Sequence, residues 1–222
     1  MSISKKRDRE MISWLSHQVR TPLSVLHNLA SLALEGGYQE SQRIEMMKII
    51  RDEAGRMKIL VGDLIDLQRI EAGIEDFDPT WLAMSSVMEE AVRRAGVSRD
   101  TVTVTEAGDE RVWGVRERLT QMVEAVLRHS AALRAPGSMI DLEVETTHEA
   151  TVVLIRDEGP QVGSDPEEIL CLGGTSGQRP GDLDLAVARA IADVHQGRVE
   201  VVNRSPAGVE FRITLPRGPA GP

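Results

Sequence analysis

Apolar residues recur at alternating intervals of three and four through the first third of the chain, the spacing of a coiled-coil or helix-bundle seam. From about Ile3 to Leu34 little except Pro22 would break a helix, and the apolar positions are Ile12, Leu15, Val19, Pro22, Leu26, Leu29 and Ala33. After Gly36 and Gly37, a second helical pattern runs from about residue 40 to 72, with an apolar face of Met47, Ile50, Ala54, Met57, Val61 and Leu64. The two patterns predict an antiparallel helical hairpin over residues 1–73.

Two long helices with broad apolar stripes cannot bury both stripes in an isolated pair. A second copy of the hairpin would complete a four-helix bundle, so we expect a homodimer. The alternative is that the stripes pack onto the second half of the same chain.

Short segments with strand and helix patterns alternate after Gly73. Residues 77–81 favour an edge strand, and the spacing of Ser86 and Glu89 predicts a capping box that opens a helix to about Ala95. Further strands are predicted at 101–106, 140–146, 151–156, 198–202 and 209–215, and helices at 116–133 and 183–195. This alternation predicts an α/β sandwich over residues 77–217. The Gly- and Pro-rich tail, 218–222, is predicted to be disordered.

Composition excludes several classes of protein. The formal net charge of −9 over 222 residues argues against a nucleic-acid surface, which needs clustered Lys and Arg. Cys171 is the only cysteine, so no internal disulfide can form, and a reducing, cytoplasmic location is expected. The sequence contains neither a signal peptide nor a run of about 18 apolar residues, so we expect no membrane contact by this segment.

His17 is the first candidate for chemistry. With Ile12 at heptad position a and Leu15 at d, His17 falls at f, the position farthest from the seam, and is expected to be exposed. An exposed helical histidine is often only a solvated surface residue. Pro22, however, lies inside the seam, where a proline costs about 3 kcal/mol and kinks the helix. Such a kink would loosen the helical turn that holds His17. A residue that must present its side chain to two different partners, one after the other, needs such freedom.

The residues around His17, Ser16 to Leu23, resemble the H-box of sensor histidine kinases, Ser-His-Glu-x-Arg-Thr-Pro-Leu. Residues 64–73 resemble the end of the family's second dimerisation helix, and the resemblance continues to Pro216. It implies a helical hairpin that forms a dimeric four-helix bundle, followed by an α/β sandwich like the histidine-kinase ATPase domain. It also implies that His17 is phosphorylated and passes the phosphoryl group to an aspartate of a response regulator.

Two neighbours of His17 bear on this role. Thr21 matches the family residue implicated in positioning water for regulator dephosphorylation. Gln18 stands where the family has glutamate, and an amide cannot accept the imidazole proton at neutral pH. Gln18 therefore argues against autophosphorylation from ATP.

One nucleotide element is retained. Asp157 and Gly159 close an apolar strand and resemble the family's Asp-x-Gly-x-Gly box, whose aspartate accepts a hydrogen bond from the adenine amino group. The alternative for Asp157 is an ordinary turn-starting residue. The second glycine of that box falls on Gln161.

The other nucleotide elements depart from the family. His129 replaces the asparagine that holds Mg²⁺, and an imidazole is a poor ligand for that ion. The alternative for His129 is a purely structural or surface role. Pro180, Asp182 and Asp184 replace the three glycines of the box that closes on the phosphates. The two aspartates suit a helix cap but oppose a triphosphate; a metal site there is the less favoured alternative. Residues 173–177 are interpreted as the lid region.

Three functions are consistent with this pattern. The first is a histidine kinase core phosphorylated on His17, with ATP and Mg²⁺ as cofactors whose binding is predicted to be weak or absent. The second is an ATP-independent phosphotransferase or phosphatase of kinase ancestry. The third is a non-enzymatic dimeric scaffold, which would have no need of an exposed histidine beside a proline. No residue is assigned as a metal ligand.

Overall fold

The computed structural model describes residues 2–73, 78–106, 110–163, 165–170 and 182–218, with side chains from residue 16 onward except those of 71, 106 and 182. The predicted lid at 173–177, Pro180 and the last four residues of the predicted tail lie outside this part. The chain forms two compact units, Met1–Ile65 and Asp66–Pro222.

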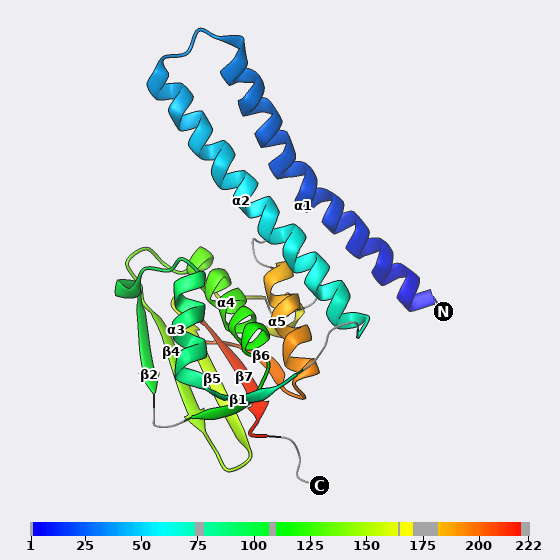
Figure 1. Cartoon of the computed structure of the whole chain (residues 1–222), viewed down its shortest axis with the longest axis vertical. Helices are drawn as coiled ribbons and strands as arrows, with labels where there is room; N and C mark the ends of the chain where they lie inside the picture. Colours follow the sequence, from blue (N-terminus) through cyan, green and yellow to red (C-terminus); the bar gives the residue numbers. More distant parts are fainter. Residues whose placement is uncertain (1, 74–77, 107–109, 164, 171–181, 219–222) are drawn as a thin grey trace. The chain divides into compact units, whose positions relative to one another are not determined.

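The first unit is a helical hairpin, blue to cyan in Figure 1. Helix α1 spans Ser2–Glu35, and helix α2 spans Glu40–Glu71 and continues into the second unit. Gly36 and Gly37 turn the chain between them with φ of +82° and +84°, a conformation that glycine adopts without steric cost. Both predicted helices are confirmed, to within a few residues at each end.

The second unit is built on a five-stranded sheet with the order β2-β4-β5-β7-β6. Its strands are β2 (Val102–Glu106), β4 (Ile140–Thr146), β5 (Ala150–Asp157), β6 (Arg198–Asn203) and β7 (Val209–Pro216). Strand β2 runs parallel to β4, and the other neighbours are antiparallel. These five strands were predicted from their alternating or apolar patterns.

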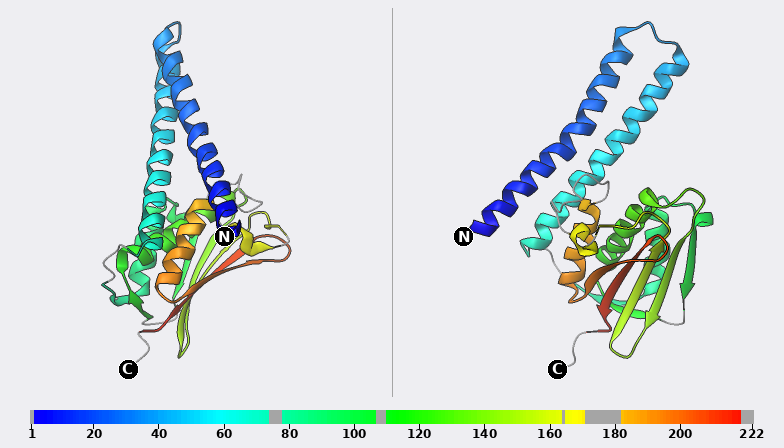
Figure 2. Two further views of the ribbon diagram at one scale, coloured as in Figure 1. Left: turned by 90° about the vertical axis from the view of Figure 1, so that its right-hand side faces the viewer. Right: turned by 180° about the vertical axis from the view of Figure 1, so that it is seen from behind.

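Three helices lie side by side on one face of this sheet (Figures 1 and 2). They are α3 (Met84–Arg94), α4 (Arg116–Leu133) and α5 (Asp182–Val194), with the short 3-10 helices η1 (Arg99–Thr101) and η2 (Pro166–Leu170) in the connections. The core between helices and sheet is fully buried and includes Leu119, Met122, Val126, Ile155, Leu185, Ile191, Phe211 and Ile213. The α/β sandwich is therefore confirmed, and Phe211 is the largest of these buried side chains.

Two local predictions differ from the structure. The strand expected at 77–81 is β1 (Thr80–Ala83), which joins β3 (Arg111–Gly114) in a separate two-stranded sheet that the sequence pattern did not predict. The capping box at Ser86 is wrong. Helix α3 begins at Met84, and the Ser86 hydroxyl donates to the Ala83 carbonyl at 2.9 Å inside the first turn. Ser86 cannot cap there because the chain enters the helix directly from β1.

Within the described residues, no helix is both long enough and apolar enough to cross a membrane.

Candidate functional site

His17 lies on the exposed side of α1. Four residues on, the Thr21 hydroxyl donates to the His17 carbonyl at 3.2 Å. Helical geometry puts residues i and i+4 on one face, so the imidazole and the Thr21 side chain are neighbours. Gln18, beside them, is half-buried. The exposure of His17 agrees with its assignment to heptad position f.

Pro22 is buried, although α1 continues through it to Glu35. A proline has no N–H, so the Gln18 carbonyl, four residues earlier, lacks the usual helical donor. The neighbouring His17 carbonyl gains a second donor from Thr21. Backbone hydrogen bonding is thus redistributed in the turn that carries His17.

Asp157 ends β5 with its side chain almost wholly buried, 3% exposed. Its Oδ1 accepts the backbone N–H of Gly159 at 2.8 Å, closing a tight turn. A Cβ on Gly159 would lie 2.7 Å from the Leu133 carbonyl oxygen at the end of α4, so only glycine fits. The structure therefore brings Asp157 and Gly159 together against α4, with one carboxylate oxygen of Asp157 used inside the turn.

Gln161 is exposed, and its amide donates to the Arg204 carbonyl in the β6–β7 connection. Asn203 secures the same segment. Its Oδ1 accepts the Val162 N–H at 2.9 Å, and its amide donates to the Val162 carbonyl at 2.9 Å. Where the family pattern has a second glycine, this chain therefore has a side chain that ties the turn to the neighbouring hairpin.

His129 belongs to the core. It is 3% exposed and packs edge-on against the ring of Phe211, with ring centroids 5.5 Å apart. This arrangement fits the interpretation of a structural histidine and does not suit a ligand for a hard, oxygen-seeking ion.

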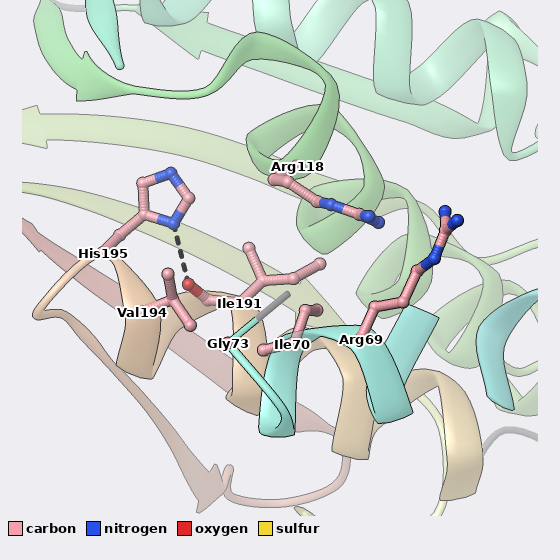
Figure 3. A pocket seen from close by; sticks show the side chains of 7 residues that line it. All are labelled: Arg69, Ile70, Gly73, Arg118, Ile191, Val194 and His195. Carbon is pink, nitrogen blue, oxygen red and sulfur yellow. Dashed lines mark hydrogen bonds between the residues drawn. The ribbon is translucent and has the colours of Figure 1, made fainter. Parts of the chain in front are cut away.

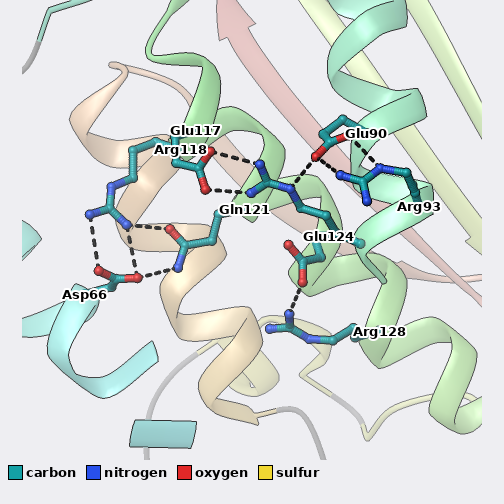
Figure 4. A network of polar contacts seen from close by, with 9 residues as sticks. Asp66, Glu90, Arg93, Glu117, Arg118, Gln121, Glu124 and Arg128 are labelled. Carbon is teal, nitrogen blue, oxygen red and sulfur yellow. Dashed lines mark hydrogen bonds and ion pairs between the residues drawn. The ribbon is translucent and has the colours of Figure 1, made fainter. Parts of the chain in front are cut away.

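Asp184 is engaged in an ion pair that the sequence analysis did not predict. Arg128 of α4 donates through Nη2 to Asp184 Oδ1 at 2.8 Å. Its Nη1 donates to Glu124 one turn earlier in α4, the contact that Figure 4 shows. About one-sixth of each side chain is exposed, so solvent screens this cluster little. Asp184 therefore does not present a bare negative charge, and Arg128 joins α4 to α5.

Helix α4 also takes part in two clusters of polar contacts, one with the last turns of α2 and one with α3 (Figure 4). Asp66, in the last turns of α2, pairs with Arg118 at 3.2 Å and accepts the Gln121 amide at 2.8 Å. Glu90 of α3 accepts from Arg93 and Arg94, and these hydrogen bonds lower its pKa to about 2. Arg94 also pairs with Glu117 at 2.6 Å, which links α3 to α4.

The residues of this chain fit only part of a Mg-ATP site. Asp157 and its turn fit an adenine contact. His129 lies in the core, and no group of three or more His, Cys, Asp or Glu side chains suited to a metal ion exists among the residues that the structure describes. Asp184 is paired with Arg128, while Pro180 and the Asp182 side chain lie outside the described residues. The two described residues of the metal and phosphate elements, His129 and Asp184, are thus held by contacts with Phe211 and Arg128.

Sequence reasoning missed the residues that act across elements. The spacing of Glu124 and Arg128 by four was a visible signal for a helical ion pair. Nothing in the sequence indicated that Arg128 also reaches Asp184, or that Asp66 joins Arg118.

Two family models match the chain. The His Kinase A (phospho-acceptor) domain matches residues 7–73, and the histidine kinase-, DNA gyrase B- and HSP90-like ATPase matches residues 114–219. The Sensor protein KdpD of Escherichia coli (strain K12) is 29% identical over 225 residues, covering 93% of this chain and 24% of that protein. The Sensor histidine kinase TrcS of Mycobacterium tuberculosis (strain ATCC 25618 / H37Rv) is 29% identical over 232 residues, covering 96% of this chain and 44% of that protein.

The fold is also similar to a solved structure, the Acinetobacter baumannii histidine kinase AdeS. The TM-score is 0.74 at 18% identity, covering 90% of this chain and 98% of that one. The chain spans less than half the length of the two curated relatives above.

Proposed function

This chain is a histidine kinase catalytic core, a phospho-acceptor domain followed by a domain of the ATPase family, and on that premise we propose that His17 carries the phosphoryl group. In the proposed reaction an imidazole nitrogen of His17 forms an N–P bond and releases its proton, while the P–O bond to the donor's aspartate or ADP oxygen breaks and that oxygen leaves with the bonding electrons. The N–P bond then breaks as an aspartate oxygen of a response-regulator receiver domain takes the phosphoryl group.

The single observation that carries this proposal is the exposure of His17 within its H-box string. Phosphorylation adds a charge of roughly −1.5 to −2 near neutral pH, which an exposed site can solvate and a seam position would bury at heavy cost. The Thr21 hydroxyl, which donates to the His17 carbonyl, lies on the same face of α1 and is proposed to position the water that dephosphorylates the regulator.

A homodimer is part of the proposal. Several apolar side chains of the hairpin remain 45% to 54% exposed in the single chain: Leu23, Ile44, Met47 and Val61. A second hairpin would bury them and complete a four-helix bundle.

We propose further that Mg-ATP binds weakly. His129 packs on Phe211, and Asp184 is paired with Arg128. Gln18, which cannot take the imidazole proton, slows transfer from any Mg-ATP that does bind. The match to the ATPase family and the buried turn at Asp157 and Gly159 support an adenine-side contact there, whereas His129 and Asp184 depart from the family pattern. A phosphorylated receiver domain is then the expected phosphoryl donor to His17.

The test measures acid-labile phosphate on the full chain, with Mg-ATP as donor in one arm and receiver domains phosphorylated by acetyl phosphate in the other. We expect labelling in the receiver arm, little in the Mg-ATP arm, and none in either arm for His17→Gln. His27→Gln is the matched control, because His27 is also an exposed histidine of α1. Equal labelling of wild type and His17→Gln would refute the role of His17. Micromolar Mg-ATP affinity by calorimetry would refute the weak-binding proposal alone.

A further inference from the structure

A cavity of about 230 Å³ opens beside His195 in the second unit (Figure 3). Its lining comes from three elements: Arg69, Ile70 and Gly73 near the end of α2, Arg118 of α4, and Ile191, Val194 and His195 at the end of α5. The proposed phosphotransfer and nucleotide residues do not line it. The cavity is smaller than the roughly 300–1,000 Å³ of sites for drug-sized ligands, so its occupant must be small.

The wall of the cavity is mainly apolar. Ile70, Ile191 and Val194 supply it, and Val194 is 42% exposed. His195 adds ring carbons and no charge. Its Nδ1 bonds with the Ile191 carbonyl at 2.8 Å, and its Nε2 accepts the Val115 N–H at 3.1 Å. Both ring nitrogens are therefore used by the protein, which leaves the wall suited to an apolar group.

The charged side chains of the lining are both arginines. Arg118 is balanced by Asp66, which it meets at 3.2 Å, and its Nη1 also donates to Gln121. Arg69 is exposed, and Figure 3 draws it on the side of the cavity away from His195. A guanidinium at the edge of an apolar cavity favours a carboxylate, which it can bind through two parallel hydrogen bonds.

We propose that this cavity binds a small amphipathic carboxylate, with its apolar part against Ile70, Ile191 and Val194 and its carboxylate on Arg69. The occupant contacts the last turn of α2 and the end of α5 at once. Its binding therefore stabilises the packing of residues 69–73 against α5, since a ligand that binds only the folded state raises stability by mass action.

The test titrates the full chain with 4-phenylbutyrate and, separately, with the neutral analogue 4-phenylbutan-1-ol, using calorimetry and ¹H–¹⁵N NMR. We expect the carboxylate to bind at least tenfold more tightly than the alcohol and to shift the amide signals of residues 69–73 and 191–195. Hydrogen exchange at residues 69–73 should slow when the carboxylate is bound.

Three variants make the result specific. Arg69→Gln should weaken the binding of 4-phenylbutyrate at least tenfold and leave the affinity for the alcohol unchanged. Arg43→Gln, which replaces an exposed arginine of the first unit, should change neither affinity. Val194→Trp should abolish the binding of both compounds, because the larger side chain fills the cavity from its exposed side. Equal affinity for acid and alcohol, no binding of the acid, or normal binding to Val194→Trp would each overturn the proposal.

Discussion

The Nε2 atom of His195 accepts the backbone N–H of Val115, the residue that precedes α4, at 3.1 Å. The same ring donates through Nδ1 to the Ile191 carbonyl one turn earlier in α5. Only a neutral imidazole can do both, because a protonated ring has a donor on each nitrogen. His195 thus joins the start of α4 to the end of α5 as long as it is uncharged.

This arrangement predicts acid sensitivity. Burial lowers the pKa of His195 below its ordinary 6.5, although the hydrogen bond with Ile191 acts in the opposite direction. The charged side chains that line the same cavity are Arg69 and Arg118, and Arg118 is paired with Asp66. The stabilisation is complete above pH 6.5 and is lost as the pH falls through the lowered pKa. We expect the free energy of unfolding to decrease by about 1 kcal/mol over this range, the value of one hydrogen bond.

Urea unfolding at several pH values between 5 and 8 measures this decrease. His195→Gln should flatten the pH dependence, because its amide does not titrate, while His17→Gln should leave the slope unchanged. A slope that is the same in all three proteins would show that His195 does not titrate in this way.

Gly208 is predicted to be intolerant of any side chain. Its φ is +99°, and a Cβ would collide with the carbonyl oxygen of Asp157. We expect Gly208→Ala to destabilise the second unit by about 2–3 kcal/mol, combining left-handed strain with a backbone clash. Gly163→Ala is the control, since a Cβ at that residue would have no other heavy atom within 4 Å. Denaturant midpoints that fall equally in both variants would contradict the argument.

The ion pair between Arg128 and Asp184 should stabilise the contact of α4 with α5. In a double-mutant cycle with Arg128→Met and Asp184→Asn, we expect a coupling energy of about 1–2 kcal/mol from unfolding experiments. The pair Lys48 and Glu45, with both side chains more than half exposed, should give a much smaller coupling. Equal couplings would mean that burial of the first pair has no energetic effect.

Gln18→Glu should increase labelling of His17 from Mg-ATP. The substitution restores a carboxylate beside the imidazole, and a positioned base contributes about 10²–10⁴-fold. At saturating Mg-ATP weak nucleotide binding does not limit the rate, so we expect a gain of at least roughly tenfold in the initial rate. The double variant His17→Gln/Gln18→Glu is the control and should remain unlabelled. If the substitution does not increase the labelling rate, the weak autophosphorylation is caused by the nucleotide-binding half alone.

Sedimentation of the full chain should give the mass of a dimer at micromolar concentration. Met47→Glu, on the predicted seam of α2 and 51% exposed in the single chain, should shift the population to monomer. Glu45→Gln, an exposed change two residues away, should leave the dimer intact. A wild-type monomer would count decisively against the bundle.

Most of the secondary structure could be predicted from the sequence, because it depends on local periodicity. The hairpin, five strands of the main sheet and helix α4 at Arg116–Leu133 all follow from apolar spacing. The exposure of His17 also followed, since a heptad assigns each position a direction. The pairing of β1 with β3 did not, because strands of four residues carry too little pattern to reveal a partner.

Which charged and polar residues pair with one another was decided only by the tertiary structure. The sequence indicated two aspartates that would repel phosphate, yet Asp184 faces Arg128 from a helix 56 positions away in the chain. His195 is likewise an unremarkable helix-end residue until folding puts it against Val115, 80 positions earlier. Local patterns determine which face of a helix is apolar. Which charges meet depends on how the helices pack on the sheet, and no spacing within one helix contains that information.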